Sequence, residues 1–232
     1  MTKDRKAARR RVGLAIVLLV LVAAVLGAWW ESHRWMPDRA RFLVQGAWLD
    51  THDGPVDWPM LKARGADFVY LTASEGPARR DEAFTAALAA ARAQKLKVGA
   101  VHVYDLCAPA DAQAANFVTI VPRDRALLPP AIALDLDSRS CPDAPGDAAM
   151  QSELTTFLNQ IEKHTEFKAI LMVSRSFEAR YRLATMVDRN FWVRQDYFEP
   201  GYTGGAWVMW TATTQLHIAG VAEPVRWVVV RK

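Results

Sequence analysis

The stretch Gly65-Ala66-Asp67-Phe68-Val69-Tyr70-Leu71-Thr72-Ala73-Ser74-Glu75-Gly76 decides the fold of this 232-residue chain. It places a short apolar run, rich in β-branched and aromatic residues, between two glycines, a pattern typical of a buried β-strand. An Ala-rich amphipathic stretch follows at Asp81–Gln94, and a second strand-like run follows at Lys97–Tyr104. The order strand, helix, strand predicts parallel strands that are joined by crossover helices.

The same alternation continues on both sides of this stretch. Strands are predicted at Phe42–Leu49, Asp67–Ala73, Lys97–Tyr104, Ala131–Asp137, Lys168–Ser174, Asn190–Arg194, Ala206–Thr211 and Val225–Arg231. Helices are predicted at Asp81–Gln94, Ala110–Val121, Ala148–His164 and Phe177–Met186. Eight strands with intervening helices predict the α/β class and a (β/α)8-type barrel. The short connections between the last three strands leave little room for helices, so we expect the barrel to be irregular there.

The N-terminus predicts a membrane anchor. Residues 12–30 are apolar and uncharged, and as a helix they would be about 28 Å long, close to the ~30 Å bilayer core. Basic residues precede this run and none directly follows it, so residues 1–11 are expected to be a cytoplasmic basic tail. The remainder would lie in the periplasm, beyond a single-pass span of the inner membrane. A cleaved signal peptide is the competing interpretation, which the bulky residues Leu26, Trp29 and Trp30 around the possible cleavage site disfavour.

Beyond the anchor, length and charge predict one near-neutral domain. Residues 31–41 are rich in charge and contain Pro37, as is typical of a linker, and residues 42–232 suffice for one hydrophobic core. Six of the 29 basic residues and one of the 25 acidic residues lie within the first twelve positions, which leaves 23 basic and 24 acidic residues downstream. This balance gives no indication of a nucleic-acid partner.

The two cysteines and five histidines indicate a disulfide rather than a metal site. Cys107 and Cys141 both lie in the exported part, where an oxidising compartment favours pairing, although two free buried thiols are the alternative. The histidines lie scattered, without the spacing of metal ligands, and neither a phosphate-binding loop nor a nucleophile elbow is present. We therefore expect no metal and no cofactor.

Residues 46–54 read Gly-Ala-Trp-Leu-Asp-Thr-His-Asp-Gly and are followed by Val56-Asp57-Trp58. This opening, together with several later stretches, resembles glycoside hydrolase family 25, the muramidases, whose own opening is Gly-Ile-Asp-Val-Ser-x-x-x-Gly and then Ile-Asp-Trp. Residues 65–76 resemble its second strand, which ends in Ala-Thr/Ser-Glu-Gly, and residues 97–104 resemble its third, which ends in Gly-Ala-Tyr-His-Phe. Residues 133–137 occupy the place of its Asp-x-Glu, and the end of the chain is similar to its Tyr-Thr/Ser, Gly and Val-Asp-Leu-Asn ending.

The resemblance implies a periplasmic protein that acts on peptidoglycan glycan strands and hydrolyses the β-1,4 bond after N-acetylmuramic acid. Three positions depart from the family: Trp48 and Arg226 replace aspartates, and Asp137 replaces the proposed acid, a glutamate. The resemblance then makes Asp137 the acid and Asp135 its partner, because residues two apart share a face of a strand. By the same spacing, Asp50 is the candidate substitute for the carboxylate lost at position 48, and Asp53 is a further alternative.

All three departures predict reduced activity. Glycoside hydrolysis needs a proton donor and a carboxylate or substrate group near the sugar, and a catalytic group displaced by about 1 Å can cost on the order of 100-fold in rate. A nearby arginine also lowers the pKa of a carboxyl. Candidate sugar contacts are Trp48, Glu75, His102, Trp192 and Trp210, each of which could instead be structural. A catalytically inactive glycan-binding protein and an envelope scaffold therefore remain as alternatives.

Overall fold

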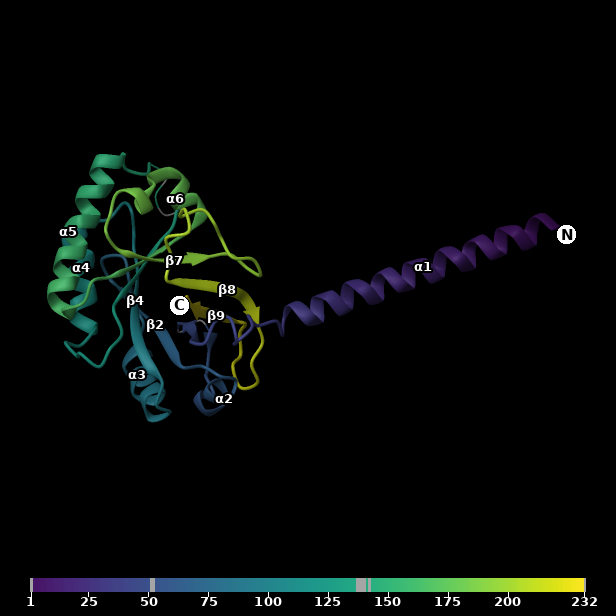
Figure 1. Ribbon diagram of the computed structural model, residues 1–232, viewed down its shortest axis with the longest axis horizontal. Helices are drawn as coiled ribbons and strands as arrows, with labels where there is room; N and C mark the ends of the chain where they lie inside the picture. Colours follow the sequence, from purple (N-terminus) through teal and green to yellow (C-terminus); the bar gives the residue numbers. More distant parts are fainter. Residues whose placement is uncertain (1, 51–52, 137–140, 142, 232) are drawn as a thin grey trace. The chain divides into compact units, whose positions relative to one another are not determined.

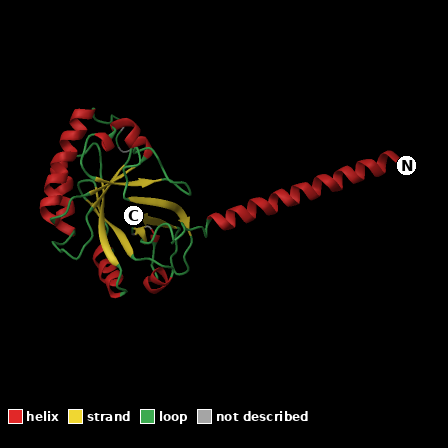
Figure 2. Cartoon of the chain, viewed as in Figure 1, coloured by secondary structure: helices red, strands yellow, loops and turns green. Residues whose placement is uncertain are grey.

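The computed structural model describes residues 2–50, 53–136, 141 and 143–231, with side chains from residue 13 onward. The chain divides into an N-terminal helical unit that ends at Trp35 and a compact unit that begins at Met36. The compact unit contains a central sheet with helices around it (Figures 1 and 2). The fold prediction concerns this second unit.

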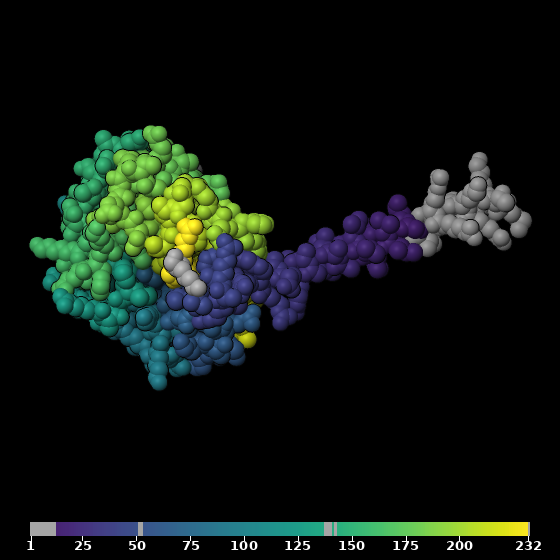
Figure 3. Space-filling view, in the orientation of Figure 1, coloured from purple at the N-terminus to yellow at the C-terminus, as the bar shows by residue number. Residues whose placement is uncertain are grey.

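The compact unit is a closed barrel of eight strands. These are β1 (Gln45–Leu49), β2 (Phe68–Glu75), β4 (Lys97–Val103), β5 (Ala131–Leu134), β6 (Ile170–Val173), β7 (Asn190–Arg194), β8 (Met209–Leu216) and β9 (Val225–Val230), while the short β3 (Arg79–Arg80) pairs with β2. Strands β1, β2 and β4 to β8 are parallel around the barrel, and β9 runs antiparallel to both β8 and β1. The first and last strands pair with each other, so the sheet closes. In the space-filling view the start of the compact unit (dark blue) and the C-terminal part of the chain (yellow) lie next to each other (Figure 3).

The barrel interior is filled by alternate residues of the strands. The buried cluster consists of Trp48, Phe68, Tyr70, Val101, Ala131, Ala133, Ile170, Met172, Trp192, Met209 and Val228. Two glycines make room for these rings: a Cβ on Gly46 would lie 2.2 Å from the Phe68 carbonyl oxygen, and one on Gly99 would lie 2.3 Å from the Tyr70 ring. The period-2 pattern of the strands thus produces the packed interior that closed barrels require.

The helices agree with the predicted order, with one addition. They are α2 (Trp58–Ala63), α3 (Phe84–Ala93), α4 (Ala110–Ile120), α5 (Asp147–Thr165), α6 (Arg175–Tyr181) and the short 3-10 helix Leu183–Thr185. No described helix connects β7 with β8 or β8 with β9, which confirms the expected irregularity. Helix α2 was not predicted; Asp57 caps it by accepting a hydrogen bond from the Met60 N–H at 2.9 Å.

The helix that precedes the barrel extends beyond the predicted membrane anchor. Helix α1 (Thr2–Ser32) passes the predicted end of the anchor at residue 30, and Gly13–Ser32 agrees in length and composition with a membrane span and equally with a signal sequence. The compact unit starts before residue 42, because the Gln45 side chain donates hydrogen bonds to the carbonyls of Pro37 and Phe42.

Candidate active site

A cleft of about 680 Å³ opens at the carboxyl ends of the parallel strands. It is lined by Trp48 of β1, residues 75–79 from the end of β2 to the start of β3, residues 103–106 at and after the end of β4, Ala133, Asp135 and Leu136 at and after the end of β5, Cys141, and Arg194 of β7. Its size is typical of small-ligand pockets, and β/α barrels carry their chemistry at this end. Three predicted site residues meet here: Trp48, Glu75 and Asp135.

Asp135 is held by an arginine. Its Oδ2 lies 2.5 Å from Nη2 of Arg194, and its Oδ1 accepts a hydrogen bond from the Leu136 N–H at 2.9 Å. Burial raises the pKa of Asp135, but the Arg194 charge and hydrogen bonds from Ser174, Arg194 and the Leu136 N–H outweigh it, so that the pKa lies below its usual value. Asp135 is therefore a carboxylate at neutral pH and no proton donor. Its expected partner Asp137 lies outside the described residues.

Trp48 and Arg226 form a packed pair at the β1 side of the cleft. They lie opposite each other in the β1–β9 register, and the Arg226 Cζ is 4.4 Å from the Trp48 ring centroid. The indole is nearly buried, and its Nε1 donates a hydrogen bond to Thr72 Oγ1 at 3.0 Å. The two replacements are thus matched to each other, since a guanidinium over an indole face is an attractive cation–π contact.

The carboxylates that could substitute for the lost aspartate are bound to the same arginine. Arg226 donates to the Trp48 carbonyl at 3.1 Å, to Asp50 Oδ2 at 2.9 Å and to Asp53 Oδ2 at 2.5 Å. Burial raises the pKa of Asp53 more than the Arg226 charge lowers it. Asp50 lines a separate, smaller cavity of about 370 Å³ rather than the cleft. Neither carboxylate belongs to the described lining of the cleft.

Glu75 lines the cleft, whereas His102 does not. Glu75 forms an ion pair with Arg79 at the turn after β2. His102 is fully buried, with Nδ1 2.8 Å from Ser74 Oγ and Nε2 3.2 Å from Gln113 Oε1. Burial lowers the pKa of His102 to about 4, although the Gln113 hydrogen bond opposes this shift. His102 is thus a neutral side chain that joins strands to a helix.

The two other tryptophans lie apart from the cleft lining. Trp192 is fully buried in the barrel interior, where its Nε1 donates to Thr211 Oγ1 at 2.8 Å. Trp210 is buried next to Phe42 and Trp207, and its Nε1 donates to the Gln195 carbonyl at 2.7 Å. In this structure both act as packing residues.

Tyr104 and Arg194 line the cleft but were not predicted as site residues. The Tyr104 hydroxyl is buried without a hydrogen-bond partner among the described atoms, and burial, followed by the charges of Glu153 and Asp105, raises its pKa. Arg194 closes the β7 side through its ion pair with Asp135. A sequence signal existed for both, since each stands at the carboxyl end of a predicted strand, where barrel sites form.

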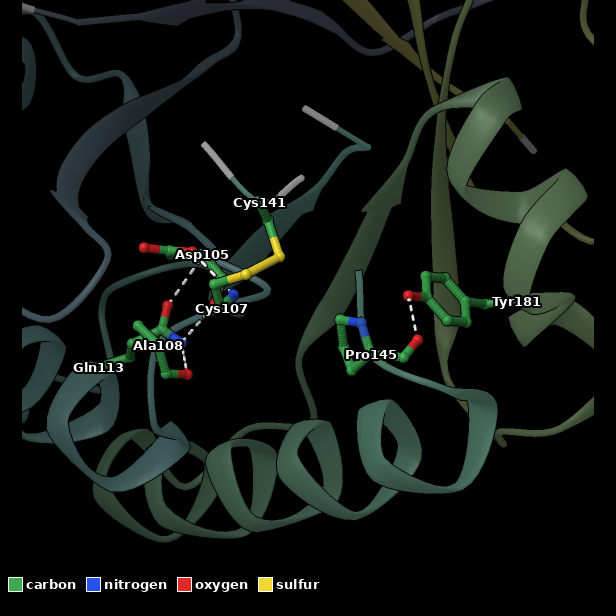
Figure 4. Close-up of a disulfide and its surroundings, with 7 residues drawn as sticks. All are labelled: Asp105, Cys107, Ala108, Gln113, Cys141, Pro145 and Tyr181. Carbon is green, nitrogen blue, oxygen red and sulfur yellow. Dashed lines mark hydrogen bonds between the residues drawn. A yellow bond between two sulfur atoms is a disulfide. The ribbon is translucent and has the colours of Figure 1, made fainter. Parts of the chain in front are cut away.

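The predicted disulfide is confirmed and bounds the cleft (Figure 4). Cys107, in the loop between β4 and α4, is joined to Cys141, in the loop between β5 and α5. Gln113 fixes the first loop, because its Nε2 donates to the carbonyls of Asp105 and Ala108 at 2.9 and 3.0 Å. The crosslink thus connects this fixed loop to the loop that follows Asp135.

Comparisons with known proteins agree on one family. The sequence model of the glycosyl hydrolases family 25 matches residues 49–221. A family 25 glycosyl hydrolase from Bacillus anthracis is similar in structure, with 23% identity and a TM-score of 0.75 over 85% of this chain and 92% of that one. The bacterial lysozyme from Streptomyces coelicolor is also similar in structure, with 20% identity and a TM-score of 0.72 over 82% of this chain and 92% of that one. No curated protein sequence matches the chain.

Proposed function

Since the chain belongs to glycosyl hydrolase family 25, we propose that it binds peptidoglycan glycan strands in the cleft and that its muramidase activity is reduced. The bond to be hydrolysed is the β-1,4 bond after N-acetylmuramic acid. Trp48 and Glu75 would contact sugar, the first through its ring and the second through hydrogen bonds. The family membership supports the substrate class, and the charges around the cleft support the reduced rate.

One observation carries the reduced rate: arginines hold four of the described carboxylates at and beside the cleft. Arg194 binds Asp135, Arg79 binds Glu75, and Arg226 binds both Asp50 and Asp53. An arginine beside a carboxyl favours its ionised form, so the carboxyl is a poorer proton donor. The arginine also partly neutralises the negative charge that would stabilise an oxocarbenium-like sugar. Asp137 is then left as the candidate acid, with a side chain one methylene shorter than that of the family's glutamate.

A second candidate, binding without turnover, is favoured by the Trp48–Arg226 pair. An indole over which a guanidinium packs at 4.4 Å fills the position of a family carboxylate with a group that carries no charge. The part of the indole that lines the cleft can contact a sugar, while an uncharged indole that is already paired with a guanidinium stabilises a developing positive charge far less than a carboxylate does. Under this alternative the cleft keeps its affinity for glycan and hydrolyses none of it.

One experiment separates these functions. The full chain in detergent and its Asp137→Asn variant are incubated with purified peptidoglycan, and both retention and new reducing-end muramic products are measured, the latter by mass spectrometry. Products that depend on Asp137 support the reduced muramidase. Retention with no products supports binding without turnover, and an absence of retention and products would favour the scaffold and contradict both glycan-based functions.

We further propose a membrane-anchored arrangement. Residues 1–11 would be a cytoplasmic tail, 12–30 a single-pass span of the inner membrane, 31–41 the connection to the barrel and 42–232 the periplasmic barrel. From Met36 onward this connection already belongs to the compact unit. The apolar segment Gly13–Ser32 supports the span, and the family's action on the cell wall supports an extracytoplasmic barrel. The partners of the protein are then peptidoglycan and the membrane itself.

A further inference from the structure

We propose that the amino end of the barrel, where the parallel strands begin, docks on an anionic lipid surface. This inference rests on the proposed membrane arrangement and adds to it the face of the barrel that meets the lipid. The amino-end face is defined by the exposed basic residues Arg64, Lys95 and Lys97 and by the exposed apolar residues Leu43 and Val44. It lies at the end of the barrel opposite to the cleft.

The five residues come from neighbouring strand beginnings. Leu43 and Val44 directly precede β1, Arg64 lies between α2 and β2, Lys95 lies between α3 and β4, and Lys97 begins β4. Strand β2 pairs with β1 on one side and with β4 on the other, and all three are parallel. Their amino ends therefore adjoin, so the basic and the apolar side chains belong to one side of the same barrel end.

The positive charge of the amino-end face is largely unpaired. Among the described residues, no carboxylate forms an ion pair with Arg64, Lys95 or Lys97. Carboxylates nearby are already bound to other arginines, in the pairs Arg39–Asp67, Arg41–Glu199 and Arg92–Asp124. Asp38 is also exposed at this end and offsets one charge. The face thus keeps a net positive charge.

Stabilisation of helix ends explains only part of this charge. Arg64 and Lys95 follow the last turns of α2 and α3, where the helix dipole favours cations. Lys97 instead belongs to a strand, and the exposed Arg231 follows β9, which pairs with β1. Lys97 and Arg231 thus add positive charge that no helix requires.

Leu43 and Val44 give the face an apolar component. They are 53% and 45% exposed, although they are consecutive residues directly before a strand. Basic side chains beside a small apolar surface suit an anionic membrane, because apolar groups enter the interface while basic groups attract the lipid phosphates. The combination therefore fits a lipid surface better than it fits a purely ionic partner.

The chain enters the compact unit at this end of the barrel. Arg39 donates a hydrogen bond to the Gly65 carbonyl, so it lies beside the beginning of β2. Along the chain, the candidate span ends at Ser32 and the compact unit begins at Met36. In the proposed membrane arrangement, the amino-end face is thus the part of the barrel that is joined to the span by the shortest stretch of chain.

The cleft end of the barrel differs in charge. Exposed arginines at that end contact groups of the barrel itself, in the pairs Arg79–Glu75, Arg80–Asn116, Arg175–Gln195 and Arg180–Asp147. Exposed carboxylates that lie there include Glu82, Asp111 and Glu223. An anionic surface is therefore attracted by the amino end and not by the cleft end.

Energy transfer from the barrel to the lipid tests the inference. The full chain carries a donor dye on one introduced cysteine, at Ala63→Cys beside the amino-end face or at Ala222→Cys between β8 and β9; both alanines are exposed. It is reconstituted into vesicles of phosphatidylcholine alone or in equal mixture with phosphatidylglycerol, with an acceptor dye on the lipid. We expect the excess of transfer from position 63 over position 222 to be larger in the anionic vesicles and to fall with added salt.

Lys95→Glu with Lys97→Glu should remove the increase in the anionic vesicles, whereas Arg175→Glu with Arg180→Glu, the same change of charge at the cleft end, should retain it. An equal excess in the two kinds of vesicle, or an increase that survives Lys95→Glu with Lys97→Glu, would overturn the inference and leave the anchor intact. A chain that floats with neither kind of vesicle would contradict both the anchor and the inference. Loss of retention on peptidoglycan in the lysine variant, without a change in transfer, would overturn the inference by assigning the face to the wall.

Discussion

At the scale of single residues, Arg226 is the centre of the altered site. Its side chain and those of its partners Asp50 and Asp53 are mostly buried. Removing one member of a buried ion pair leaves an uncompensated charge and costs about 3–5 kcal/mol. We therefore expect Arg226→Gln to lower the free energy of unfolding by roughly this amount, measured by denaturant unfolding of the barrel.

Arg79→Gln is the matched control for that change. Arg79 also pairs with a carboxylate, but its side chain is 71% exposed and that of Glu75 is 41% exposed. An exposed ion pair contributes between about 0 and 1 kcal/mol, so this variant should unfold almost as the wild type does. Similar losses in both variants would mean that Arg226 has no special structural role.

The residues that replace the family's carboxylates, Trp48, Asp137 and Arg226, should also limit the rate of hydrolysis. Replacing Trp48 and Arg226 by Asp, and Asp137 by Glu, gives back the carboxylates that the family has at these positions. Because a displacement of about 1 Å can cost on the order of 100-fold, we expect this triple variant to release reducing ends at least on the order of 100-fold faster than the wild type. The measurement is the initial rate of reducing-end formation from purified peptidoglycan.

The double variant Trp48→Asp with Arg226→Asp is the control for the contribution of Asp137→Glu. It restores the two aspartates but keeps the shorter acid, so its rate should lie between those of the wild type and the triple variant. A folded triple variant with no activity above that of the wild type would show that the loss of activity has another origin, in the backbone or in Arg194.

At the scale of elements, His102 connects β2, β4 and α4. Its ring contacts Ser74 and Gln113 and lies 4.8 Å from the Phe157 ring of α5. Because the folded pKa is about 4 and the ordinary value is 6.5, the unfolded chain binds the proton more readily between these pH values. The stability that His102 contributes is thus present above pH 6.5 and is lost as the pH falls towards 4.

The expected loss is about 3 kcal/mol over this pH range, since each pKa unit corresponds to about 1.4 kcal/mol. We expect His102→Gln, which keeps hydrogen-bonding groups but does not titrate, to lose this part of the pH dependence. Denaturant unfolding at several pH values between 4 and 7 measures both proteins. Parallel pH profiles for the wild type and the variant would show that the histidine is not held neutral.

The strand order could be predicted from the sequence because apolar, β-branched runs alternate with amphipathic stretches. Helix α2 was missed for two reasons. It has only six residues, too few for a periodic pattern, and Pro59 stands in its first turn. The orientation of strand faces was also missed. A period of two shows that Trp48 and Asp50 share a face, but it does not show that the neighbours Val101 and Met209, rather than His102 and Trp210, face the barrel interior. Ion pairs between distant strands, such as Arg194 with Asp135, follow only from the closed barrel.

At the scale of the whole molecule, the cleft and the chain's entry lie at opposite ends of the barrel. The chain enters β1 at Gln45, the amino end of a parallel strand, whereas the cleft lies at the carboxyl ends. The start of the first barrel strand is therefore remote from the cleft.

The last prediction concerns the membrane topology of the proposed anchor. Single cysteines are introduced by Thr2→Cys and by Phe198→Cys, the latter at an exposed position of the barrel, since both native cysteines are joined in the disulfide. With a membrane-impermeant maleimide on spheroplasts, we expect position 198 to be labelled and position 2 to be labelled only after permeabilisation. This expectation follows from the basic residues before the proposed span, because such residues favour a cytoplasmic N-terminus. The intact mass of the membrane-bound protein is the control: loss of the residues before Trp29 would identify a cleaved signal sequence, and the barrel would then be free in the periplasm.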